Sequence, residues 1–136
     1  MRTEQVKIKV HNGTENHSAV YVLSRGRNSG KVLNQPCPNC YAIQVPAEQL
    51  AQVRAVAHIL FISEKLKPHL QGSVIEFITV GAYRKQFFAL WRSISPATVT
   101  QTAQALADLE QHQTAIQKQL VLLRQLRQSI AFAALV

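Results

Sequence analysis

The stretch that decides the fold is residues 95–136, SPATVTQTAQALADLEQHQTAIQKQLVLLRQLRQSIAFAALV. It predicts one long helix, because no glycine or proline follows Pro96. Ser95 is suited to be the N-cap, and proline is favoured at the first helical position. If residues 97–130 are all helical, the helix is about 50 Å long. That is too long to be buried inside a domain of this size, so the helix requires a partner.

The apolar residues of this helix predict that it packs along another long helix. Leu109 begins a series in which every seventh residue is apolar, and further leucines fall on the same side. Such a repeat is typical of helices that pair in a coiled coil. The predicted interface consists of Leu109, Ile116, Leu120, Leu123, Leu126 and Ile130. The partner is expected to be a second copy of the chain, in a homodimer.

Length and composition limit the class of protein. The chain has 136 residues, of which 47% are hydrophobic. These values predict one globular domain with an appended helix rather than a disordered chain. No apolar run approaches the roughly 18 residues of a transmembrane span, and the N-terminus lacks the apolar segment of a signal peptide. We therefore expect a cytoplasmic protein that does not enter a membrane.

The charge is unevenly distributed along the chain. The net charge is +8, and residues 1–95 hold twelve basic and five acidic residues, whereas residues 96–136 hold three and two. A basic folded domain suggests a polyanionic partner, most often nucleic acid. A basic isoelectric point alone is also common among small soluble proteins, so the charge does not decide the function.

The part before the long helix predicts a small α+β domain. Segments with strand-type patterns are 5–10, 18–23, 41–45 and 73–79, and segments with helical patterns are 46–65 and 80–93. We therefore expect an α+β fold in which a small mixed sheet with two helices precedes a long, coiled-coil-like C-terminal helix.

A basic loop lies between the second and third predicted segments. Residues 24–31, SRGRNSGK, combine two glycines with three cations. A phosphate-binding P-loop needs four residues between its glycines and a Ser or Thr after the lysine. Here three residues separate the glycines and Val32 follows the lysine, so that interpretation fails. The alternatives are a solvated turn and a hairpin that contacts a phosphate backbone. The candidate DNA contacts are Arg25, Arg27, Asn28 and Lys31.

A second candidate patch lies at the start of the helix predicted over residues 80–93. Tyr83 precedes two cations, Arg84 and Lys85. A tyrosine beside cations near a helix N-terminus can contact phosphate or stack on a base. The alternative is an exposed first turn without a ligand, since exposed cations are the norm.

Two cysteines, Cys37 and Cys40, stand in the sequence Pro-Cys-Pro-Asn-Cys. Their spacing makes them a weak metal candidate, because a structural zinc site needs four ligands and the chain has no other cysteine. A redox pair of the thioredoxin type would lie in a βαβ unit, whereas a strand is predicted here. The favoured interpretation is a tight turn with free thiols. No catalytic constellation is apparent, so we expect neither an enzyme nor a cofactor.

Three stretches together resemble the target-recognition half of a type I restriction–modification specificity subunit. They are LSRGRNSGKV at 23–32, LQGSVIEFITVGAY at 70–83 and LEQHQTAIQKQLVLLRQLRQSI at 109–130. The resemblance implies a DNA-recognition-type domain over residues 1–94 and a spacer helix over residues 95–136 that pairs antiparallel with another copy. It also implies binding of DNA without catalysis, and a possible methyltransferase subunit as partner.

The chain departs from that family in several respects. A full specificity subunit has two recognition domains and two spacer helices, and its Pro-rich junction before the spacer helix is replaced here by residues 91–101, WRSISPATVTQ. Residues 21–83 also resemble a family of short, uncharacterised Bacteroidetes proteins, through NSGK at 28–31, PCPNC at 36–40 and GSVI at 72–75. An alternative function is a protein-interaction accessory of a mobile element that docks on restriction–modification subunits without binding DNA itself.

Overall fold

The computed structural model describes residues 5–13 and 18–136. The chain divides into two compact units, Met1–Thr100 and Gln101–Val136, and each is described by itself. The predicted division between residues 94 and 95 differs from this boundary by a few residues. The difference arises because Val99, in the first turn of the long helix, is buried in the core of the first unit.

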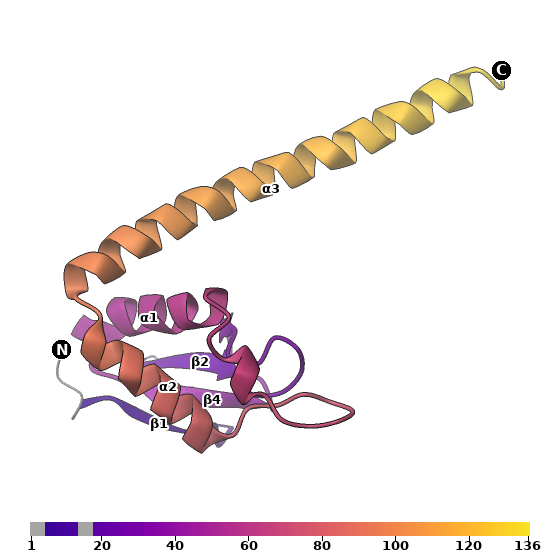
Figure 1. Cartoon of the computed structure of the whole chain (residues 1–136). Helices are drawn as coiled ribbons and strands as arrows, with labels where there is room; N and C mark the ends of the chain where they lie inside the picture. Colours follow the sequence, from indigo (N-terminus) through magenta and orange to yellow (C-terminus); the bar gives the residue numbers. More distant parts are fainter. Residues whose placement is uncertain (1–4, 14–17) are drawn as a thin grey trace. The chain divides into compact units, whose positions relative to one another are not determined.

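A small antiparallel sheet forms one layer of the first unit (Figure 1). Its strands are β1 (Lys7–Val10), β2 (Ala19–Leu23), β3 (Val32–Leu33) and β4 (Cys40–Gln44), in the order β1-β4-β2-β3. The predicted α+β class is confirmed, but the prediction of a mixed sheet was wrong, because all three strand pairings are antiparallel. Short connections such as residues 24–31 join antiparallel neighbours, whereas parallel strands need a long crossover.

Two helices cover one face of the sheet. After a 3-10 turn, η2 (Ala47–Gln49), helix α1 spans Leu50–Ile62, and α2 spans Val80–Ser93 after the short η3 (Lys67–His69). The core between the layers combines Val20, Val22 and Ile43 of the sheet with Val53, Val56 and Leu60 of α1 and Tyr83, Phe87 and Trp91 of α2. These α2 residues recur every fourth position and therefore share one helical face.

The helix predicted over residues 80–93 is confirmed, with Thr79 as its N-cap. The Thr79 Oγ1 atom accepts a hydrogen bond from the Ala82 N–H at 3.1 Å. The helix predicted over 46–65 is shorter than expected and ends at Ile62. The strand predicted over residues 73–79 was wrong. Gln71 and Phe77 bond each other through their backbones, at 2.8 and 2.9 Å, and so close a local loop. Phe77 also forms an isolated antiparallel bridge with Arg25, but the segment forms no strand of the sheet.

The long helix α3 spans Pro96–Ala133. Ser95 is confirmed as its N-cap, because the Thr98 N–H donates to Ser95 Oγ at 3.1 Å. At about 1.5 Å per residue, 38 residues give a length of about 57 Å. Within the described part of the chain, no helix combines the length and apolar character needed to cross a membrane.

Candidate nucleic-acid interface and pairing helix

The basic loop, residues 24–31, has a defined conformation between β2 and β3. The Gly30 N–H donates to the Leu23 carbonyl at 2.6 Å, and Ser29 Oγ donates to the Gly26 carbonyl at 2.7 Å. Ser29 is buried, and the bond from its hydroxyl to the Gly26 carbonyl stabilises the turn. The loop therefore presents its cations from a fixed backbone.

A second loop, the facing loop (residues 70–78), is hydrogen-bonded to the basic loop. The Gly26 N–H donates to the Glu76 carbonyl at 2.6 Å, and the Ile78 N–H donates to the Ser24 carbonyl at 3.1 Å. The Tyr41 hydroxyl in turn donates to the Ile78 carbonyl at 2.6 Å. These bonds tie both loops to the sheet, so the two loops form one edge of the domain.

The predicted DNA contacts of the basic loop lie on the surface. The side chains of Arg25, Arg27, Asn28 and Lys31 are all exposed. Within residues 5–13 and 18–136, none of the three cations forms an ion pair with a carboxylate. The three positive charges are therefore available to a ligand, and the loop backbone that carries them is held in place by hydrogen bonds.

Sequence reasoning missed the apolar surface beside these cations. In the facing loop, Val74 is 94% exposed and Ile75 is 51% exposed, although this segment was predicted to be a strand. A hollow of about 310 Å³ is lined by residues of both loops and by two residues near the start of β4: Ser24, Arg25, Asn39, Tyr41, Phe77 and Ile78. The sequence signal for a loop rather than a strand was the Gly72–Ser73 pair, because glycine and serine are common in turns.

The prediction that Tyr83 contacts DNA was wrong. Tyr83 is fully buried, and its ring lies 6.2 Å from that of Phe87 and 6.4 Å from that of Tyr41. Burial raises the pKa of the Tyr83 hydroxyl, which therefore stays protonated. The signal that was available is the four-residue spacing of Tyr83, Phe87 and Trp91, which places all three on one face of α2.

Replacing Tyr83 by phenylalanine is expected to leave the free energy of unfolding unchanged or to raise it by up to about 1 kcal/mol. The reason is that its buried hydroxyl has no hydrogen-bond partner among the described residues. Urea unfolding measures the effect. Tyr41→Phe is the matched control, because it removes the bond to the Ile78 carbonyl and should cost about 1–2 kcal/mol. An equal loss in both variants would contradict this account.

The two cations of the second predicted patch, Arg84 and Lys85, are both exposed. Arg84 also donates to the Ile8 carbonyl of β1, from Nε at 2.8 Å and from Nη2 at 2.6 Å. Arg84 thus joins α2 to the sheet, a role that its sequence neighbours did not indicate. With Lys7 and Lys9 it lines a hollow of about 560 Å³ along β1. These two lysines are cations that sequence reasoning did not consider.

Cys37 and Cys40 bracket a turn at residues 38–39, and both thiols are unpaired. Cys37 is half-buried and Cys40 is buried. Among the residues that the structure describes, no group of three or more potential metal ligands includes them. The weak metal candidate therefore gains no further ligand from the described fold.

The residues of the predicted pairing interface are exposed along α3. Leu109, Ile116, Leu120, Leu123, Leu126 and Ile130 are between 47% and 66% exposed. At about 100° per residue they fall within a sector of about 120°. A monomeric protein rarely exposes so many contiguous large apolar side chains, so this face is suited to a partner.

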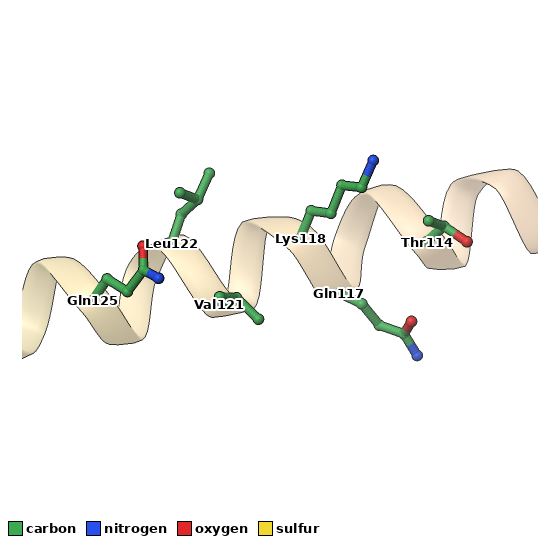
Figure 2. A pocket seen from close by; sticks show the side chains of 6 residues that line it. All are labelled: Thr114, Gln117, Lys118, Val121, Leu122 and Gln125. Carbon is green, nitrogen blue, oxygen red and sulfur yellow. The ribbon is translucent and has the colours of Figure 1, made fainter.

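Figure 2 shows a second surface of α3 that sequence reasoning missed, on which Val121 and Leu122 lie among four polar side chains. A shallow hollow of about 430 Å³ is lined by Thr114, Gln117, Lys118, Val121, Leu122 and Gln125. Positions 114, 117, 118 and 121 have the spacing of the four-residue hole that receives a side chain in coiled-coil packing, and 118, 121, 122 and 125 repeat it. The sequence signal for this second surface was the run of four apolar residues at 120–123. Four successive residues point to every side of a helix, so they cannot all lie in one interface.

The first unit is thus a two-layer α+β domain with a cationic edge, and a long helix with exposed apolar faces follows it. The chain belongs to a family of unknown function, DUF6943, whose model matches residues 8–133. No curated protein and no solved structure matches the chain. The family description names no activity, so the function has to be argued from the residues themselves.

Proposed function

We propose that this chain is a DNA-binding protein that pairs through α3 and brings two basic loops to one duplex. The observation that carries the proposal is the exposure of Arg25, Arg27 and Lys31 on a loop whose backbone is fixed by hydrogen bonds. Arginine and lysine side chains contact phosphate oxygens and supply most of the sequence-independent affinity for DNA. A fixed loop reduces the conformational entropy lost on binding.

The distribution of charge supports a polyanionic ligand for the first unit. Residues 1–95 contain twelve basic and five acidic residues, whereas the charges of α3 nearly cancel. The excess therefore belongs to the α+β domain. Lys85 and the β1 lysines, Lys7 and Lys9, are further exposed cations of this domain.

The exposed apolar face of α3 supports pairing with a second copy. The acidic residues Asp108 and Glu110 lie in its first half, and Lys118, Arg124 and Arg127 lie in its second half. An antiparallel pair brings these opposite charges closer together than a parallel pair does, and it also opposes the two helix dipoles. A two-fold pair of DNA-binding domains sets the spacing of two half-sites on the duplex.

The proposed class is a specificity-type subunit, which directs a methyltransferase or restriction complex to its DNA site. The resemblance of residues 23–32, 70–83 and 109–130 to one half of such a subunit supports this assignment. On this proposal the chain contributes DNA binding, and a partner subunit performs the chemistry.

Replacing Arg25, Arg27 and Lys31 together by glutamine is expected to weaken binding to duplex DNA and to flatten its salt dependence. Each phosphate contact contributes about 0.9 to the slope of log K against log[salt], so the slope should fall by roughly 2.7. Fluorescence anisotropy with a labelled duplex at several salt concentrations measures both quantities.

The matched control replaces Arg54, Lys65 and Arg92 by glutamine. These cations are exposed, lie outside both loops, and give the same change in net charge. This variant should keep most of the slope. The proposal fails if the unaltered chain does not bind duplex DNA at low salt, or if the control loses as much slope as the basic-loop variant.

A protein-interaction accessory is the second candidate, and the hollow around Val121 and Leu122 favours it. Val121 and Leu122 lie outside the predicted pairing interface, so they could contact a second helical neighbour. For this function, the chain would co-purify with a co-expressed methyltransferase subunit, and Val121→Lys would abolish the association. The isolated chain would not bind DNA even at low salt.

A further inference from the structure

The turn between β3 and β4 places the two cysteines within reach of each other. Pro38 and Asn39 occupy its central positions, and Cys40 is the first residue of β4. The outer Cα atoms of a β-turn lie less than about 7 Å apart. A disulfide requires a Cα separation of about 4.4–6.8 Å, so Cys37 and Cys40 are in range without a large movement of the backbone.

The side chains of the pair meet in one small cluster. Cys37 packs against Tyr21, Cys40 and Ala42 on the side of the sheet where these three residues form their own buried group. Cys40 is only 2% exposed, whereas Cys37 is half-buried and reachable from solvent. The two cysteines are the only ones in the chain, so each has no other intramolecular partner.

The surrounding backbone holds the turn in place on both sides. The His11 N–H donates to the Cys40 carbonyl at 3.2 Å, and the Ser24 N–H donates to the Asn39 carbonyl at 2.9 Å. Both bonds use backbone atoms, so a covalent bond between the thiols need not break them. The second bond connects the turn to the first residue of the basic loop.

We propose that Cys37 and Cys40 form a dithiol site that a small-molecule disulfide oxidises to an intramolecular disulfide. The thiolate of Cys37 attacks one sulfur of the small disulfide, which forms a mixed disulfide and releases one small thiol. The sulfur of Cys40, after losing its proton to solvent, attacks the Cys37 sulfur and releases the second small thiol. The two protein thiols are oxidised, the small disulfide is reduced, and the electrons balance.

The difference in burial sets the order of the two steps. The attacking thiol must be accessible, which selects Cys37. Burial raises the pKa of the Cys40 thiol, so Cys40 keeps its proton until the mixed disulfide lies beside it. The neighbouring Cys37 then supplies an electrophilic sulfur within the same turn. This chemistry is independent of the proposed DNA binding.

The test exposes the purified full-length chain to buffers of graded glutathione disulfide and glutathione. Samples are quenched with acid, alkylated with N-ethylmaleimide and weighed by intact mass spectrometry. As the buffer becomes more oxidising, the chain should lose both alkylatable thiols together. The product should be lighter than the unalkylated reduced chain by two hydrogen atoms, and it should carry neither N-ethylmaleimide nor glutathione.

Two variants separate the roles of the thiols. Cys40→Ala should stop at a stable glutathione adduct on Cys37, whereas Cys37→Ala should leave Cys40 largely reduced. Circular dichroism checks that both variants fold. The measurement on the unaltered chain tests the proposal even if neither variant folds. A lasting glutathione adduct on the unaltered chain, a disulfide between two copies, or two thiols that remain alkylatable throughout would each overturn the proposal.

Discussion

Replacing Ile116 and Leu123 together by lysine is expected to convert the proposed α3-paired dimer into a monomer. These side chains are 61% and 62% exposed in the single chain and stand seven residues apart in the proposed interface. Burying each is worth roughly 1.5 kcal/mol or more, so four lost side chains in a dimer cost about 6 kcal/mol. Every 1.4 kcal/mol is tenfold in Kd, so the dimer should weaken by about 10⁴-fold. Analytical ultracentrifugation over a range of concentrations measures the change.

The control for this variant adds the same charges to another side of α3. Gln111 and Gln128 are exposed, lie outside the predicted interface and do not line the hollow of Figure 2. Their replacement by lysine should leave the dimer intact. If both double variants remain dimeric, the pairing face is not the one that contains Ile116. If both become monomeric, added charge rather than apolar contact explains the loss.

Replacing Gly30 by alanine is expected to lower the free energy of unfolding by about 2–5 kcal/mol. Gly30 has φ +94°, and a side chain in this region of φ costs about 1–2 kcal/mol. An added Cβ would also overlap Leu66 Cδ1, and Leu66 is buried in the core at 2% exposure. Overpacking of a buried site costs a further ~1–3 kcal/mol. Urea unfolding monitored by Trp91 fluorescence measures the loss.

Gly26 provides the matched control in the same loop. Its φ of +95° is nearly identical, but nothing lies within 4 Å of the position that a Cβ would occupy. Gly26→Ala should therefore show only the backbone cost of about 1–2 kcal/mol. If the two variants lose the same stability, contact with Leu66 does not determine the requirement for glycine at position 30.

Local signals in the sequence were sufficient for α2 and for the start of α3, whereas α1 was predicted too long. The start of α3 follows from Ser95 and Pro96, and α2 was predicted with its observed ends, because caps and helical periodicity depend on neighbouring residues alone. The exposure of the basic loop was also expected from its glycines and cations. The exposed apolar side chains of α3 follow from its seven-residue repeat.

Signals of the same kind misled where a residue had a partner distant in sequence. Arg84 lay beside Lys85 in a predicted cationic patch, but its guanidinium bonds the carbonyl of Ile8, 76 residues away. Residues 73–79 have the composition of a strand. In the structure they form a loop, in which Phe77 makes an isolated antiparallel bridge to Arg25, which is distant in the sequence, as well as one to Gln71.

The sequence by itself determined the α+β class, the long helix and its apolar repeat, because these depend on residues that interact within a few positions. Only the tertiary structure decided that Tyr83 is core, that Arg84 joins α2 to β1, and that the facing loop supports the cations of the basic loop. It also decided that Cys37 and Cys40 share one buried cluster beneath a turn. Each of these outcomes depends on which segments pack together, and packing is set by the free energy of the whole chain rather than by any one stretch.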